Sequence, residues 1–182
     1  MKNQPTAARA PAGSQIDRLV PGSDFHDAWS IPPADAALDA LGQFLRVARS
    51  TPGWIDAAMR LRNRLVGLVG LKNLGGLSDI DTAKPAASYR PGDRVGIFTL
   101  LSVSDTEVLL GDSDKHLDVV VSVHRQPADL PAQALVTVTT VVKVHNWLGR
   151  FYMAPVRPAH RVIAQAMVRA VGNPLPPLRQ AR

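Results

Sequence analysis

The chain has 182 residues, of which 46% are hydrophobic and 20% charged, and it carries a net charge of +6. This length and composition are typical of one globular domain with a substantial core and argue against a disordered chain. The absence of cysteine excludes disulfides, thiolate metal sites and thiol nucleophiles. The N-terminus lacks the apolar core of a signal peptide, and the most apolar helical stretch, residues 54–71, is interrupted by charges. We therefore expect a cytoplasmic protein with no integral membrane segment.

The positive charge is concentrated in the last third of the chain. Residues 1–125 carry 14 basic and 14 acidic residues, whereas residues 126–182 carry seven basic residues and one acid. Such an asymmetry can attract an anionic partner, but it also fits a solvated basic face. No cluster of Lys and Arg with interleaved aromatics resembles a nucleic-acid-binding module, so we expect no nucleic-acid partner.

The chain begins with a Pro/Ala-rich segment, residues 1–16, which we expect to be a disordered tail. We expect the same of residues 172–182. Residues 17–171 then form the single predicted domain. Alternation of apolar residues around Phe25, Trp29 and Ile31 predicts a short strand, which the following proline pair ends. Residues 34–50 have the apolar spacing of a helix.

A second helix is predicted from Trp54, because Trp54, Leu61 and Leu65 recur at helical spacing. This apolar face fits either the core or the wall of a ligand cavity. The following connection, residues 73–93, shows no periodicity and is long enough to suggest a functional lid or a linker.

The sequence pattern then changes to runs of β-branched residues separated by turn residues, which predicts an antiparallel meander over residues 94–145. A last helix is predicted from Pro158, which suits a first helical position, with an apolar face that includes Val162, Ile163 and Met167. This order of elements indicates an α+β helix-grip fold: a curved antiparallel sheet, two short helices and a long C-terminal helix across the sheet.

The order resembles the START and birch-pollen-allergen (SRPBCC) superfamily of helix-grip proteins. The run PGDRVGIFTLL, the turn GDSDKHLD and the segment HNWLGRFYMAPVRPAHR resemble a bacterial domain-of-unknown-function family, also found attached to short-chain-dehydrogenase-like domains. The likeness covers about residues 20–171. It implies the fold and an apolar ligand pocket, and it supplies no catalytic residues. The chain has no GxGxxG fingerprint, and we expect no cofactor.

Two acidic and histidine-containing patterns are candidate metal sites. Asp112, Asp114 and Asp118 superficially suggest calcium, but the spacing lacks the EF-hand pattern and a hairpin turn explains it better. His116, Asp118 and His124 share strand parity, yet the opposite face, which we expect to point inward, is formed by Leu117, Val119, Val121 and Val123. We therefore predict no metal site and no catalytic residue here.

The segment 145–161 is predicted to be a corner between the last strand and the last helix, with Phe151, Tyr152 and Met153 packed beneath the helix start. Arg157 and Arg161, four residues apart near that helix start, could bind an anionic head group at the mouth of a cavity. The alternative is that both arginines are solvated or paired with an aspartate.

The leading functional hypothesis is noncatalytic binding of a small apolar or amphipathic molecule, which can be anionic, between the sheet and the C-terminal helix. One alternative is a cyclase- or hydratase-like enzyme of the same fold that uses Tyr152 or His160. Another is a protein-interaction domain with a filled core and an exposed apolar patch. The oligomeric state is left open. The candidate ligand-binding residues are Trp54, Leu61, Leu65, Phe98, Tyr152, Arg157, His160 and Arg161.

Overall fold

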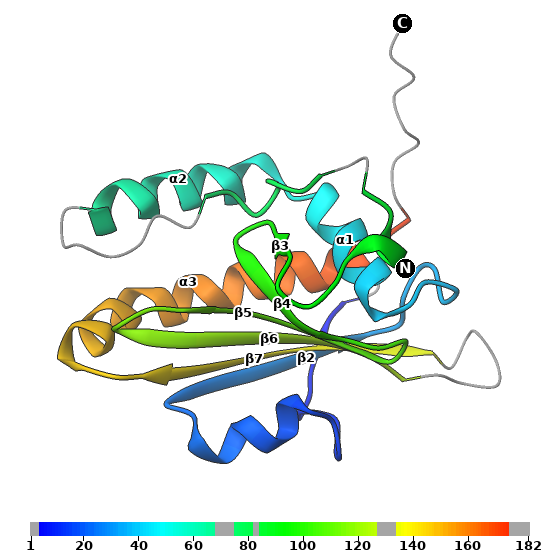
Figure 1. Cartoon of the computed structure of the whole chain (residues 1–182), viewed down its shortest axis with the longest axis horizontal. Helices are drawn as coiled ribbons and strands as arrows, with labels where there is room; N and C mark the ends of the chain where they lie inside the picture. The colour runs from blue at the N-terminus through cyan, green and yellow to red at the C-terminus, as the bar shows by residue number, and fades with distance from the viewer. Residues whose placement is uncertain (1–3, 68–74, 82–83, 127–133, 175–182) are drawn as a thin grey trace, which may run out of the picture.

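A seven-stranded antiparallel sheet forms the base of the molecule in a computed structural model that describes residues 4–67, 75–81, 84–126 and 134–174 (Figure 1). The strand order across the sheet is β1-β2-β7-β6-β5-β4-β3. The strands are β1 (Thr6–Ala7), β2 (Phe25–Ile31), β3 (Arg94–Val95), β4 (Phe98–Val103), β5 (Glu107–Ser113), β6 (Leu117–Gln126) and β7 (Leu135–Val144).

Three α-helices cover one face of this sheet: α1 (Ala40–Arg49), α2 (Gly53–Gly67) and the long α3 (Trp147–Val171) (Figure 1). The short helix η1 (Ile16–Gly22) lies against the other face, and η2 (Ala86–Ser88) precedes β3. This is the predicted α+β helix-grip layout, in which a curved antiparallel sheet is crossed by a long C-terminal helix. Among the described helices none is long and apolar enough to cross a membrane.

The alternating pattern of β6 and β7 turns one set of side chains toward the helices, as the sequence predicts. The two strands pair with Val119 opposite Val142 and Val121 opposite Thr140. Because successive side chains of a strand point to opposite faces, this register places a surface of valines under α3. The predicted turn between β5 and β6 is confirmed, with Asp114 Oδ1 accepting hydrogen bonds from the backbone N–H groups of His116 and Leu117.

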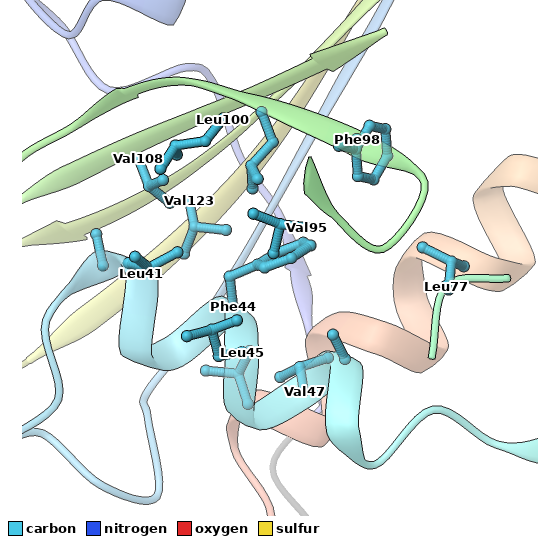
Figure 2. Close-up of a cluster of buried hydrophobic side chains, with 14 of the residues drawn as sticks. Leu41, Phe44, Leu45, Val47, Leu77, Val95, Phe98, Leu100, Val108 and Val123 are labelled. Carbon is cyan, nitrogen blue, oxygen red and sulfur yellow. The ribbon is translucent and has the colours of Figure 1, made fainter. Parts of the chain in front are cut away.

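The main hydrophobic core lies between the sheet and helix α1. Figure 2 shows Leu41 and Phe44 of α1 pointing toward Leu100, Val108 and Val123 of the sheet. Helix α1 starts cleanly because its N-cap residue, Asp39, accepts a hydrogen bond from the backbone N–H of Gly42 at 2.6 Å. The core therefore fixes α1 and leaves the space between the sheet, α2 and α3 less completely filled.

The last helix starts eleven residues earlier than predicted, so the interpretation of residues 145–161 as a corner is wrong. Helix α3 begins at Trp147, and the side chain of its N-cap, Asn146, accepts a hydrogen bond from the backbone N–H of Gly149 at 3.0 Å. Pro155 and Pro158 lie inside the helix with exposed side chains. Each proline removes one N–H donor from the helix, and the strong cap upstream outweighs the start signal read from Pro158.

The expectation of a disordered tail over residues 1–16 is also corrected. Thr6 and Ala7 pair with Ser30 and Trp29 of β2. Ile16 is completely buried in a second apolar cluster, on the face of the sheet opposite to α3. Of the C-terminal segment, residues 175–182 lie outside the described residues.

The connection predicted over residues 73–93 contributes to the core wherever the structure describes it. Leu77 and Tyr89 are buried in the main hydrophobic cluster. Ser88 and Tyr89 close the short helix η2 through backbone hydrogen bonds to Pro85 and Ala86. Residues 73–74 and 82–83 lie outside the described residues.

Candidate functional site

A cavity of about 390 Å³ lies between the sheet and the three α-helices. Its floor is formed by the inward-facing side chains of β6 and β7, and its sides by one face each of α1, α2 and α3. Pro155 and Ala159 of α3 line the cavity and are also exposed, so the cavity reaches the surface beside the first half of this helix. The apolar lining residues include Phe44, Met59, Phe98, Val119, Val121, Val138, Val142, Ile163 and Met167.

The volume and chemistry of this cavity match those of small-molecule sites. Such sites occupy roughly 300–1,000 Å³ and combine apolar walls with a few convergent polar groups. The polar side chains that line this cavity are Gln43, Arg62, Asp112, Asp114, Thr140, Tyr152 and His160. They occur in separate groups, whose geometry differs.

Arg62 of α2 and Tyr152 of α3 form the first polar group. The Arg62 Nε donates a hydrogen bond of 3.0 Å to the Tyr152 hydroxyl, and the guanidinium carbon lies 5.4 Å from the centre of the tyrosine ring. Both residues line the cavity. Arg62 Nη1 also donates a hydrogen bond of 3.0 Å to the side-chain oxygen of Asn63, and the planar guanidinium matches the geometry of a carboxylate or phosphate.

Asp27 of β2 and His160 of α3 form the second group. Asp27 Oδ1 lies 3.1 Å from His160 Nε2, and Asp27 Oδ2 accepts a hydrogen bond of 3.1 Å from the indole N–H of Trp29. Burial raises the pKa of Asp27, but the hydrogen bonds from His160, Trp29 and Thr140 and the charge of His160 outweigh this effect and leave the pKa below its usual value. The ionised Asp27 therefore orients the His160 ring at the cavity wall.

Gln43 of α1 places a third polar group at the cavity. Its Nε2 donates a hydrogen bond of 2.5 Å to the backbone carbonyl of Asp35, which can only accept, so the amide orientation is fixed. The other amide atom, Oε1, is buried and finds no donor among the described residues. A buried acceptor without a donor costs about 1–3 kcal/mol.

The aspartates of the β5–β6 turn serve the fold. Asp114 binds backbone N–H groups, and Asp112 lies 3.7 Å from the guanidinium of Arg94. Asp118 faces the opposite side of the sheet, 2.9 Å from His145. Among the described residues no three His, Asp or Glu side chains are grouped as metal ligands.

The structure brings three of the eight predicted site residues to the cavity: Phe98, Tyr152 and His160. Trp54 and Leu61 do not line it and are 49% and 59% exposed, so the predicted cavity face of α2 is wrong. The helix instead turns Ile55, Ala58, Met59 and Arg62 inward. Leu65 lies in α2, but its side chain is outside the described residues.

Arg157 and Arg161 are both exposed and do not line the cavity, so the predicted arginine grip is not formed. Arg157 donates a hydrogen bond of 3.1 Å to the backbone carbonyl of Asp24 and lies over the ring of Phe25 at 5.7 Å. The reason is that α3 continues through both positions, so they project from the outer side of a helix and not toward a helix start.

Sequence reasoning missed Asp27, Gln43 and Arg62. Strand parity carried the signal for Asp27, because it lies two residues from Phe25 and from Trp29 and therefore shares their inward face. Arg62 follows Ile55 by seven residues and Met59 by three, so these residues form a helical stripe one position away from the stripe of Trp54 and Leu61. The large apolar ring of Trp54 makes the wrong stripe look like the buried one. Gln43 carried no signal, since a buried glutamine looks like a surface residue in a helical pattern.

Comparison with known proteins adds the family. No curated protein and no solved structure shows significant similarity to the chain. The sequence matches the family described as protein of unknown function, DUF2867, over residues 19–167, which covers strands β2 to β7, helices α1 and α2, most of α3 and all the cavity-lining residues up to Met167. The chain therefore belongs to the DUF2867 family.

Proposed function

We propose that the protein binds a small amphipathic molecule in the cavity between the sheet and α3. The observation that carries this proposal is an apolar cavity of about 390 Å³ at whose wall Arg62 and Tyr152 meet. The valines of β6 and β7 suit an aliphatic or aromatic body. The guanidinium of Arg62 suits a carboxylate or a phosphate at one end of the ligand.

The helix-grip layout supports the resemblance to the START and birch-pollen-allergen superfamily, and we propose that the DUF2867 family belongs there. The same volume favours ligand binding over an interaction domain with a filled core.

Native mass spectrometry of freshly purified protein tests the proposal, with denaturing extraction to identify any bound compound. A fluorescence titration with anilinonaphthalene sulfonate, an amphipathic anion, tests whether the cavity binds such a molecule once any bound compound has been removed. Ala164 lines the cavity and Ala154 of the same helix is exposed outside it. We expect Ala164→Phe to fill the cavity and abolish dye binding, and Ala154→Phe to leave it unchanged. Equal dye binding in both variants would contradict the proposal.

Arg62 has its own matched control in Arg60, which is exposed on the outer side of the same helix. Arg62→Leu is expected to weaken binding of the anionic dye at least tenfold, since a charge-assisted hydrogen bond contributes about 1.5–3 kcal/mol. Arg60→Leu removes the same charge from α2 and is expected to have an effect of less than twofold.

Catalysis is the second candidate, and the Asp27–His160 pair at the cavity wall favours it. A histidine oriented by a carboxylate is the usual arrangement of a general base, as a cyclase- or hydratase-like reaction would require. The compound recovered by extraction is the substrate or product to test. Conversion of that compound by the wild type, and its loss in His160→Gln with binding retained, would establish an enzyme. Binding without conversion would leave the first proposal alone.

A further inference from the structure

The end of the molecule where α2 and α3 meet exposes an unusual set of apolar side chains. Trp147 and Phe151 are 75% and 74% exposed and lie four residues apart, on one face of the first turns of α3. Leu61 of α2 is 59% exposed. The contact between Arg62 and Tyr152 joins the two helices next to Leu61 and Phe151. Figure 1 shows the C-terminal end of α2 and the N-terminal end of α3 at the same end of the molecule.

Exposed arginines accompany these apolar side chains. Arg60 and Arg64 of α2 and Arg150 of α3 form no ion pair with another described residue. The acid on α2, Asp56, accepts a hydrogen bond from Ser78 at 2.8 Å, and the first turn of α3 contains no acid. In the β5–β6 turn beside the start of α3, Asp112 and Asp114 are partly buried and already engage Arg94 and backbone N–H groups. This docking end therefore combines apolar rings with an excess of positive charge; it consists of Arg60, Leu61, Arg64, Trp147, Arg150 and Phe151.

We propose that the docking end binds the surface of an anionic phospholipid bilayer. Trp and Phe side chains partition into the interface between lipid headgroups and acyl chains, and arginines beside them bind anionic headgroups. The inference goes beyond the proposed ligand binding and is independent of what the cavity holds.

A bilayer fits this surface better than a second copy of the chain. The exposed parts of two aromatic rings and one leucine amount to roughly 400 Å², so a second copy would also have to bury the arginines to reach the about 800 Å² that each partner of a stable protein interface contributes. Two copies joined here would also bring like charges together, which disfavours association. An anionic bilayer supplies the complementary charge over any area. Docking in this orientation places the cavity wall at Arg62 and Tyr152 next to the lipid.

Vesicle sedimentation with the full chain tests the proposal. The probes are vesicles of equal parts phosphatidylcholine and phosphatidylglycerol, and vesicles of phosphatidylcholine alone. We expect sedimentation with the anionic vesicles only, with weaker partitioning at high salt. The triple variant Arg60→Gln/Arg64→Gln/Arg150→Gln is expected to lose about fivefold in partitioning per arginine, since each contributes about 1 kcal/mol near an anionic surface. Trp147→Ala/Phe151→Ala is expected to lose at least tenfold.

Matched controls separate the docking end from general charge and apolarity. Arg9, Arg18 and Lys143 are exposed, and Arg18 and Lys143 lie on the opposite face of the sheet from α3. Their triple change to Gln removes the same net charge and is expected to retain at least half of the wild-type partitioning. Leu19→Ala, at an exposed leucine of η1, is the apolar control.

Several outcomes would overturn the proposal: no sedimentation of the wild type with anionic vesicles, equal losses in docking-end and control variants, or unchanged binding in Trp147→Ala/Phe151→Ala. Circular dichroism and a thermal melt confirm that each variant is folded. Light scattering on a size-exclusion column measures whether a second copy of the chain binds at this end instead. A lipid-free dimer that Trp147→Ala/Phe151→Ala converts to a monomer would assign this end to contacts between copies and would also overturn the proposal.

Discussion

Asp27 Oδ1 and His160 Nε2 lie 3.1 Å apart and connect strand β2 to helix α3 at the wall of the cavity. The pair is supported from both sides, because the Trp29 indole donates to Asp27 and the Phe25 ring meets the His160 ring edge-on at 5.5 Å. Within the described parts of the chain, few side-chain hydrogen bonds connect α3 and its cap to the sheet and its loops, and this one lies at the wall of the proposed ligand cavity. We therefore expect a change at this pair to affect both stability and ligand binding.

The pKa of Asp27 makes this contact sensitive to acid. Because the folded-state pKa lies below the ordinary value of 3.8, ionised Asp27 stabilises the fold at all pH values above 3.8, and this stabilisation is lost as pH falls through the folded-state pKa. Asp27→Asn is expected to lower the unfolding free energy by about 1–3 kcal/mol at neutral pH and by much less once the pH has fallen below the folded-state pKa of Asp27.

Urea unfolding of wild type and variant from neutral pH down to the acid limb measures this difference. Asp105→Asn is the control, because Asp105 is exposed and its side chain has no hydrogen bond to a described residue. A constant difference between wild type and Asp27→Asn at every pH would show that the loss comes from packing and not from the ionised carboxylate.

Gly149 is required where α3 crosses the β5–β6 turn. A Cβ at this position would lie 2.4 Å from the carbonyl oxygen of His116 and 2.8 Å from Val144 Cγ1. Because backbone cannot move aside cheaply, Gly149→Ala is expected to destabilise the protein by about 1–3 kcal/mol. Gly53, at the start of α2, has nothing within 4 Å of its Cβ position.

Gly53→Ala is the matched control and is expected to be neutral or slightly stabilising, since alanine is the better helix former. Thermal unfolding of both variants measures the difference. Equal melting temperatures would mean that the first turns of α3 shift freely away from the turn, against the close approach seen at His116.

The sequence predicts the sheet and the long helix well because their patterns are local. Val119, Val121 and Val123 occupy every second position on the inward face, and one inward face is enough to set the register of a strand. The start of α3 could not be predicted so well. Its boundary depends on Asn146, whose side chain caps Gly149 and whose amide also donates to the carbonyl of Lys115 in a turn far away in the sequence. Pro158 gave a stronger local signal that tertiary contacts override.

The site itself is less predictable than the fold because its polar residues come from separate elements. Tyr152 and His160 were found from the composition of one segment, whereas Arg62 requires the rotation of α2 about its axis. That rotation is set by the buried Ile55 and leaves Trp54 exposed. Large apolar residues usually turn inward, so a helix that exposes its tryptophan contradicts the sequence pattern.

Glu107 tests the corrected N-terminal segment. This buried carboxylate accepts hydrogen bonds from the backbone N–H groups of Gln15 and Ile16 and from the Ser122 hydroxyl. Glu107→Ala leaves these donors buried and is expected to lower the unfolding free energy by about 1–3 kcal/mol. It should also release residues 4–16 from the sheet.

Limited proteolysis with mass spectrometry detects this release as faster cleavage before Ile16. Asp105→Asn, two residues away and exposed, provides the control and is expected to be cleaved at the wild-type rate. Wild-type cleavage in Glu107→Ala would mean that strand β1 and Ile16 alone hold the segment in place.

The contact between Arg62 and Tyr152 is expected to hold α2 over the cavity. Tyr152→Phe removes the hydroxyl that accepts from Arg62 Nε but keeps the ring under the guanidinium, so it should cost about 0.5–1.5 kcal/mol. Arg62→Ala removes both interactions and should cost more. Hydrogen exchange of the α2 amides measures the effect, with α1 as the internal reference, because its core contacts do not involve either residue. We expect faster exchange confined to α2, with a larger increase in Arg62→Ala than in Tyr152→Phe. This result would show that the pair holds α2 over the cavity. Unchanged exchange in both variants would assign the attachment of α2 to Ile55 and Met59 instead, since these are the apolar side chains it turns toward the core.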